Sequence, residues 1–307
     1  MKFIKSFIIF SLVIFIGTNG CFASPTPEYL ETKPQITKLA QQCSGQPYIT
    51  VDTEFFTPEG QHKLRIIQVG HANPKTGAVE VSIINCFSNA LKDPKTLRGF
   101  FDILQDGTIT KVFHAPREDL KLLSQLMGGK KVTNCFDTQL AYACISDNAT
   151  IGYGALVKQY EGVALDKSKQ TSAWWKNKLS QEQLRYAAND VFYLHRIYPK
   201  LLAQLQSLKR EAMYSEEFDR IYTRKPLMQL SISHEFNERM TLDSDLKSKL
   251  FITQSLVKLY SQSLSIAQSL LLTTDEIKAH LIKQQFSKST SEWRKGLFNL
   301  LELVLSY

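Results

Sequence analysis

Residues 48–55 read Tyr-Ile-Thr-Val-Asp-Thr-Glu-Phe. Because β-branched and aromatic residues dominate this run, it predicts a β-strand that ends in acidic residues. Asp52 and Glu54 stand two positions apart, so their side chains point to the same face of that strand. Adjacent carboxylates repel each other and need a compensating cation, and Mg²⁺ and Mn²⁺ favour carboxylate oxygens. Taken alone, however, the pair is better explained as an exposed acidic strand end.

The flanking sequence predicts an α/β domain followed by helices. Strand-rich segments come first and helical periods alternate with short strands afterwards, which indicates a mixed sheet. Beyond residue 206 only helical spacing is found, and this predicts a small all-helical domain. Strands are expected at 47–56, 64–69, 79–85 and 111–114, helices at 36–42, 94–104, 117–126 and 180–205, a strand and helix within 134–145, and C-terminal helices at 246–272, 275–285 and 292–305.

Two further acidic positions carry possible chemistry. Asp119 falls in the first turn of the helix expected after His114, where the helix dipole commonly favours acidic residues. Tyr186 and Asp190 stand four apart and share one face of a later helix. A phenol beside a metal-bound carboxylate can orient an attacking water, although a half-buried helix face explains this pair equally simply. The joint occurrence of Asp-x-Glu, Asp and Tyr-x-x-x-Asp in this order outweighs the separate explanations.

This order resembles the three motifs of the DEDD 3′-5′ exonucleases in their Tyr variant, and the chain resembles ribonuclease D over residues 36–205. The segments that carry the resemblance are 51–55, 66–70, 112–120, 136–139, 162–168 with Trp174, and 179–194. The resemblance implies an RNase H-like mixed β-sheet flanked by helices. It also implies a hydrolase that removes nucleoside 5′-monophosphates from the 3′ ends of RNA, or of single-stranded DNA.

The same resemblance implies roles for individual residues. Two divalent ions, Mg²⁺ or Mn²⁺, would be held by the four acidic residues, and a phenol would position the attacking water. These catalytic positions are Asp52, Glu54, Asp119, Tyr186 and Asp190. Substrate contacts are expected at Thr53, Phe55, Gln68, His114 and Lys167. His114 could contact the terminal phosphate or buttress its motif, and Lys167 could meet a phosphate or lie in a solvated loop.

The C-terminal part resembles, more weakly, the helicase-and-RNase-D C-terminal (HRDC) domain. The Trp293-Arg294 pair is similar to a pair in that domain, and residues 241–307 leave room for one copy, whereas bacterial ribonuclease D commonly has two. A helical connector is expected over 206–240. Its basic stretch 209–225, with interleaved tyrosines, could contact nucleic acid or form a solvated helix.

The N-terminus has the layout of a secretory signal. Lys2 and Lys5 precede an apolar run, and small residues follow, so residues 1–23 are expected to be a signal peptide and 24–35 a linker. Export to the periplasm or medium is therefore expected, with no stable membrane span in the mature chain. A cytoplasmic or membrane-anchored protein, or one lipidated at Cys21, is the alternative. Four cysteines follow, either bridged in an oxidising compartment or separately buried: Cys43, Cys86, Cys135 and Cys144.

Composition narrows the class of protein further. The chain has 307 residues, 43% of them hydrophobic, which excludes global disorder and suits a globular core. Its net charge of +8 suits a polyanion partner without establishing one. A monomer that binds nucleic acid is expected. Other readings are a catalytically weak nucleic-acid-binding protein that retains the exonuclease fold, which the full set of motif residues argues against, and a membrane-anchored interaction protein.

Overall fold

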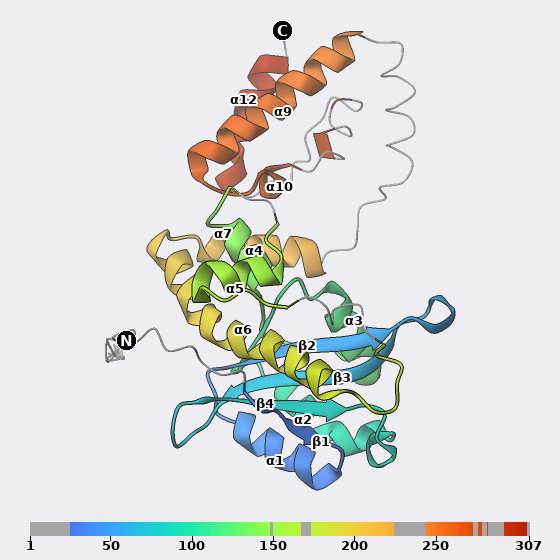
Figure 1. Cartoon of the computed structure of the whole chain (residues 1–307). Helices are drawn as coiled ribbons and strands as arrows, with labels where there is room; N and C mark the ends of the chain where they lie inside the picture. Colours follow the sequence, from blue (N-terminus) through green and yellow to red (C-terminus); the bar gives the residue numbers. More distant parts are fainter. Residues whose placement is uncertain are drawn as a thin grey trace, which may run out of the picture.

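A six-stranded mixed sheet forms the centre of the larger part of the protein (Figure 1). The computed structural model describes residues 25–147, 150–166, 173–223, 244–272, 276–277, 281 and 292–305. The strand order is β1-β4-β3-β2-β5-β6, with β2, β3 and β4 antiparallel and the other three parallel to their neighbours. The strands are β1 Glu28–Leu30, β2 Tyr48–Phe56, β3 Lys63–Ala72, β4 Val79–Asn85, β5 Thr110–Phe113 and β6 Cys135–Asp137. The predicted mixed sheet is thus confirmed.

Helices cover both faces of this sheet. One face packs on α1 (Lys33–Cys43), α2 (Arg98–Gln105) and α3 (Arg117–Leu126), the other on α4 (Thr138–Ala143), α5 (Tyr153–Glu161) and α6 (Gln181–Ser207). The strands alternate accordingly, so that Val51 enters the core beneath α1 while the preceding Thr50 faces α6. Figure 1 shows α6, in yellow, lying across β2 and β3.

A close approach holds α6 against β2. The hydroxyl of Thr50 donates to the carbonyl of Val191 at 2.9 Å. A Cβ atom at Gly70, on β3, would lie 2.3 Å from the Thr50 hydroxyl oxygen and 3.1 Å from the Val191 carbonyl oxygen. Glycine at this position therefore permits the spacing that brings the middle of α6 over the end of β2.

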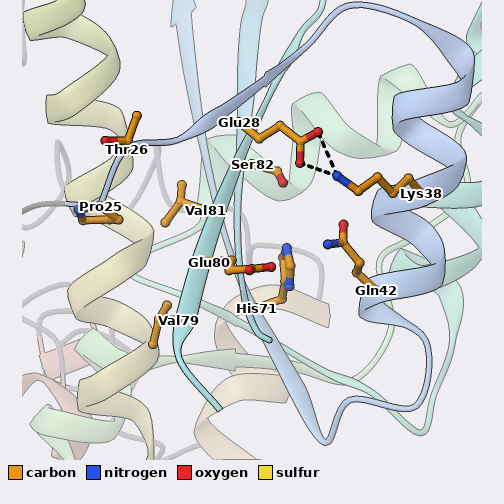
Figure 2. Close-up of a pocket in the computed structure, with 10 residues that line it drawn as sticks. All are labelled: Pro25, Thr26, Glu28, Lys38, Gln42, His71, Val79, Glu80, Val81 and Ser82. Atoms are coloured by element: carbon orange, nitrogen blue, oxygen red, sulfur yellow. Dashed lines mark hydrogen bonds and ion pairs between the residues drawn. The ribbon is translucent and has the colours of Figure 1, made fainter. Parts of the chain in front are cut away.

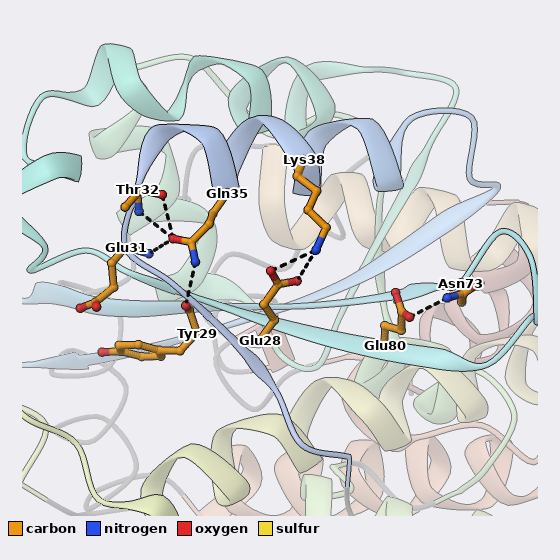
Figure 3. A network of polar contacts seen from close by, with 8 residues as sticks. All are labelled: Glu28, Tyr29, Glu31, Thr32, Gln35, Lys38, Asn73 and Glu80. Carbon is orange, nitrogen blue, oxygen red and sulfur yellow. Dashed lines mark hydrogen bonds and ion pairs between the residues drawn. The ribbon is translucent and has the colours of Figure 1, made fainter.

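The expectation of a linker over residues 24–35 is wrong from residue 28 onward, where the chain forms a strand and then a helix. Strand β1 pairs in parallel with β4, with Glu28 opposite Ser82, and α1 begins at Lys33. The side-chain oxygen of Gln35 accepts the N–H groups of Glu31 and Thr32, a capping arrangement visible in Figure 3. A three-residue strand is too short to show alternation, and Pro34 suits a first helical turn as well as a linker.

The C-terminal part is helical wherever the structure describes it. Its elements are α7 (Glu211–Phe218), a π-helical turn η4 (Asp219–Thr223), α9 (Ser244–Leu264), α10 (Gln268–Leu271), a 3₁₀ turn η5 (Glu292–Arg294) and α12 (Lys295–Leu305). The helix predicted over 246–272 is interrupted at Ser265, whose φ of 49° lies in the left-handed region. Most of the helix predicted at 275–285, and residues 224–240 of the predicted connector, lie outside the described residues.

Polar contacts to backbone carbonyls join the two parts. Arg210 donates to the carbonyls of Cys144 at 2.6 Å and Ser265 at 3.0 Å. The N–H of Ala267 donates to the carbonyl of Ala143 at 2.8 Å. The C-terminal helices are therefore docked on α4 through backbone groups.

Other sequence expectations have mixed outcomes. The signal peptide predicted over 1–23 lies outside the described residues. Among the described helices, none combines the length and apolar character needed to cross a bilayer. Cys43, Cys86, Cys135 and Cys144 are free thiols in this structure; Cys43 and Cys144 are buried, whereas Cys86 and Cys135 are partly buried.

Candidate active site

Three acidic side chains meet where the second half of β2 lies beneath α6. Asp52, Glu54 and Asp190 each offer a carboxylate oxygen, and these oxygens lie within 4.8 Å of one another. Asp52 and Glu54 share the face of β2 that α6 covers, and the close packing at Gly70 brings Asp190 down onto them. We call these three residues the carboxylate cluster. The structure thus brings together three of the four acidic residues that were expected to hold metal ions.

Asp119 lies beside the cluster rather than within it. It comes from the first turn of α3, on the opposite face of the sheet. It is not one of the three residues whose carboxylate oxygens lie within 4.8 Å of one another. The Thr53 hydroxyl donates a short hydrogen bond to its carboxylate. The charge of Asp119 nevertheless raises the pKa of Asp52, second only to burial, which shows that the two groups are close.

Burial and mutual repulsion make the cluster unfavourable as a set of bare anions. Burial first, and neighbouring carboxylates second, raise the pKa of Asp52 well above its usual value and that of Glu54 to about 9. Burial likewise raises the pKa of Asp190. Carboxylate oxygens held this close form a hard, anionic donor set, which fits a divalent cation such as Mg²⁺ or Mn²⁺.

Tyr186 adds a neutral donor to the cluster. Its side chain hydrogen-bonds Asp190, one helical turn further along α6. Burial, and then the charges of the cluster, raise the pKa of Tyr186, so the phenol stays protonated. Trp174 packs beside it with ring centroids 6.4 Å apart and is 3% exposed, so this tryptophan is a packing residue.

Two residues that were predicted to contact the substrate, Gln68 and Thr53, hydrogen-bond acidic residues of the site instead. Gln68 is opposite Asp52 in the β2–β3 pairing, is fully buried, and donates to the Asp52 carboxylate at 3.4 Å. Thr53 is 5% exposed and bonds Asp119. In this structure the Gln68 side chain therefore faces Asp52, across the β2–β3 pairing, and the Thr53 side chain faces Asp119 on the other side of the sheet.

The remaining predicted contacts differ in placement. Phe55 is half-buried next to a register shift in β2, with its ring edge-on to His62 at 4.6 Å. His114 lies with Nδ1 3.0 Å from the Thr138 hydroxyl, and burial lowers its pKa. Two roles were expected for His114, contact with the terminal phosphate or support of its motif. The neutral, packed imidazole favours the second role. Lys167 lies outside the described residues.

Sequence reasoning missed Tyr153, at the start of α5. Its hydroxyl lies 2.9 Å from the carbonyl of Asn189 and also donates a short hydrogen bond to the carbonyl of Asp190. The phenol therefore fixes the backbone that carries an acidic ligand. Nothing local in the sequence marks this role, because the partner is 37 residues away.

A separate hollow lies among β1, β4 and α1 (Figure 2). Its charged lining groups are already paired, since Lys38 contacts Glu28 at 3.1 Å and Glu80 accepts from Asn73 at 2.6 Å (Figures 2 and 3). His71, which is 1% exposed, completes the wall. The lining gives no indication of a particular ligand.

Comparison with known proteins identifies the family. A family model described as 3′-5′ exonuclease matches residues 27–206. The chain belongs to this 3′-5′ exonuclease family. The chain is 32% identical over 191 residues to ribonuclease D of Jannaschia sp., with 62% of this chain and 48% of the relative covered. It is 36% identical over 178 residues to ribonuclease D of Pseudomonas paraeruginosa, with 56% and 44% covered. The matched region thus spans about half the length of these relatives.

Solved structures show the same fold. Escherichia coli RNase D, described as an exoribonuclease involved in structured RNA processing, matches with a TM-score of 0.58 at 21% identity, covering 92% of this chain and 76% of that one. Trypanosoma brucei RNase D in complex with RNA matches with a TM-score of 0.51 at 21% identity, covering 66% and 73%. The predicted α/β, RNase H-like architecture with an all-helical C-terminal part is therefore confirmed. The narrower HRDC assignment stays a prediction.

Proposed function

We propose that this protein is a metal-dependent 3′-5′ exonuclease that hydrolyses phosphodiester bonds at the 3′ ends of RNA and releases nucleoside 5′-monophosphates. The observation that carries the proposal is the carboxylate cluster, formed by β2 and α6 inside a domain of the 3′-5′ exonuclease family. Carboxylates held this close in a partly buried site have no structural benefit of their own. A bound cation would offset the repulsion between them.

The position of each residue in the site suggests its role. Asp52, Glu54 and Asp190 would hold one divalent ion, and Asp119, braced by Thr53, would share a second ion with Asp52. Mg²⁺ or Mn²⁺ at such a site lowers the pKa of water and offsets charge on the attacking and leaving oxygens. The protonated Tyr186 phenol, anchored near Asp190, would orient the attacking water toward the terminal phosphate.

RNA is the proposed substrate for two reasons. The relatives are ribonucleases D, and one of the similar structures is a complex with RNA. The net charge of +8 also favours a polyanion, because cationic side chains that neutralise phosphates release counterions. Single-stranded DNA presents the same phosphates, so both substrates belong in the test.

The test is nucleotide release from 3′-labelled RNA and DNA oligonucleotides with Mg²⁺, Mn²⁺ or EDTA. The wild type is expected to release 5′-monophosphates only with a divalent ion, and Asp52→Asn to lose this activity. Glu80→Gln is the matched control, since Glu80 is a sheet carboxylate away from the cluster. Binding of RNA without any metal-dependent release would support the alternative, a nucleic-acid-binding protein that has lost catalysis.

We further propose that residues 1–23 direct export and that the mature protein is a monomer. The charged start, apolar run and small residues of that segment support the first proposal. N-terminal sequencing of the protein recovered from the periplasm or medium should begin after residue 23, whereas an intact Met1 in a cytoplasmic fraction would contradict export. Light scattering of the purified mature chain tests the second proposal.

A further inference from the structure

Asp137, at the end of β6, is a buried acceptor of several hydrogen bonds. It is 3% exposed. One carboxylate oxygen accepts the backbone N–H groups of Ala115 at 2.8 Å and Gln139 at 2.9 Å. The other accepts the hydroxyl of Tyr222 at 2.7 Å. This acidic residue is therefore separate from the carboxylate cluster and fully engaged in holding other groups.

The group that Asp137 holds most directly is the turn between β5 and α3. Ala115 adopts a φ of 54°, a left-handed conformation that is costly for a residue with a Cβ atom. Its N–H is fixed by Asp137, and its carbonyl accepts the N–H of Arg117 at 2.9 Å. Helix α3 starts at Arg117 and carries Asp119 in its first turn. The position of Asp119 therefore depends on a strained turn that Asp137 secures.

Tyr222 comes from outside the domain that the family match covers. The match ends at residue 206, whereas Tyr222 lies in η4, after α7. Burial and Asp137 raise the pKa of Tyr222, so the phenol remains a donor, and the charges of Arg117 and Asp119 also act on it. The phenol is thus held at Asp137, whose other carboxylate oxygen accepts the N–H of Ala115 just before α3.

The segment that carries Tyr222 is itself fixed at several points. Tyr214 of α7 accepts the backbone N–H of Asp137 at 2.7 Å and stacks on Phe136 with ring centroids 4.7 Å apart. Glu217 of α7 is fully buried and accepts from Arg294 of the C-terminal helices at 2.7 Å. The Tyr222 hydroxyl therefore acts on Asp137 from an anchored element.

We propose that Tyr222 is a positioning residue for the active site: through Asp137 and the turn at Ala115, it fixes Asp119 where a second divalent ion is held. This rests on the proposed function, because it takes Asp119 as a ligand of that ion. It implies that the segment 207–223, beyond the matched exonuclease domain, completes the active site. Partners outside the ligand shell that orient metal ligands commonly change metal affinity by about 10–100-fold when removed.

The test compares Tyr222→Phe with Tyr142→Phe in the full-length chain. Both lose a phenol hydroxyl, and the Tyr142 hydroxyl bonds Gln159 at 2.9 Å. Mn²⁺ binding is measured without nucleic acid, by titration calorimetry and by the electron paramagnetic resonance signal of free Mn²⁺. We expect Tyr222→Phe to weaken the weaker of two Mn²⁺ sites about tenfold and leave the tighter site unchanged. Tyr142→Phe should bind both ions like the wild type.

The double variant Tyr222→Phe/Asp119→Asn separates positioning from general loosening. If Tyr222 acts through Asp119, the double variant binds Mn²⁺ no more weakly than Asp119→Asn alone. Additive losses, equal weakening by Tyr142→Phe, or wild-type Mn²⁺ binding by a folded Tyr222→Phe protein would each overturn the proposal. Mn²⁺ binding requires no hydrolysis, so absence of nucleotide release from the wild type would contradict the proposed function separately.

Discussion

Replacing Asp190 by Asn should stabilise the protein when no metal is present and destabilise it relative to wild type when metal is added. Glu54 illustrates the reason, because its pKa is raised from 4.5 to about 9 by burial and then by the charges of Asp190 and Asp119. The folded state therefore binds more protons than the unfolded state between these values, and stability falls as pH rises through this window. Removing the charge of Asp190 reduces the penalty, and Asn keeps the size of the side chain.

The size of the effect follows from the separation of the oxygens. Two unit charges 4.8 Å apart repel each other by about 3.5 kcal/mol at an effective dielectric constant of 20. Asp52 and Glu54 are only half-buried, and solvent screening reduces the expected gain to about 1–2 kcal/mol at pH 8. The melting temperature without metal should then rise by a few degrees. At pH 5, close to the pKa of 4.5 that Glu54 has in the unfolded chain, the wild-type penalty has hardly built up and the gain should largely disappear.

Thermal unfolding in EDTA and in Mn²⁺, at pH 5 and pH 8, measures both halves of the prediction. An ion at 100 times its dissociation constant stabilises the wild type by about 2.7 kcal/mol, so the order of the two proteins should reverse when Mn²⁺ is added. An Asp190→Asn protein that is less stable than wild type in EDTA at pH 8 would refute the reasoning. So would a Mn²⁺-induced shift of equal size in both proteins.

Three other substitutions test the packing and chemistry around the cluster. Gly70→Ala would place a Cβ atom 2.3 Å from the Thr50 hydroxyl oxygen of β2. It should lower the free energy of unfolding in urea by about 1–3 kcal/mol and abolish activity. The control Gly107→Ala, whose Cβ atom would have nothing within 4 Å, should leave the free energy of unfolding nearly unchanged. Tyr186→Phe keeps the packing but loses the phenol, so kcat should fall by about 100-fold while Mn²⁺ affinity stays within about twofold; unchanged kcat would contradict its role. Arg294→Ala removes one of the two arginines that contact the buried Glu217, with Arg220 remaining, and should cost about 1.5–3 kcal/mol in urea unfolding; a cost under about 1 kcal/mol would show that this buried pair does not hold the C-terminal helices.

Much of the fold was predictable because its long elements have clear periods. The β4 strand and α3 have the predicted bounds, and α6 begins within one residue of its predicted start. The convergence of Asp52, Glu54 and Asp190 also followed, since motif order and side-chain direction together fix where they point. Short or broken elements were not predictable: β1 has three residues, and Ser265 interrupts a helix whose apolar spacing continues across it.

The supporting residues of the site were beyond local sequence reasoning. The role of Gln68 depends on which β2 residue it faces, and only strand register decides that. Asp137 looks like an ordinary helix cap, because its side chain accepts the N–H of Gln139 two residues later. Its partner Tyr222 is 85 residues away and contributes through tertiary packing alone.

Strand β1 limits how the N-terminus can be trimmed or tagged. It forms an outer edge of the sheet, and Leu30, 1% exposed, inserts into the core beneath α1. A recombinant version that lacks residues 28–30 would leave the backbone groups of β4 open to pairing with another molecule. Expression plasmids that start the mature protein at residue 24 or 25 keep that edge covered and should give material that resists aggregation.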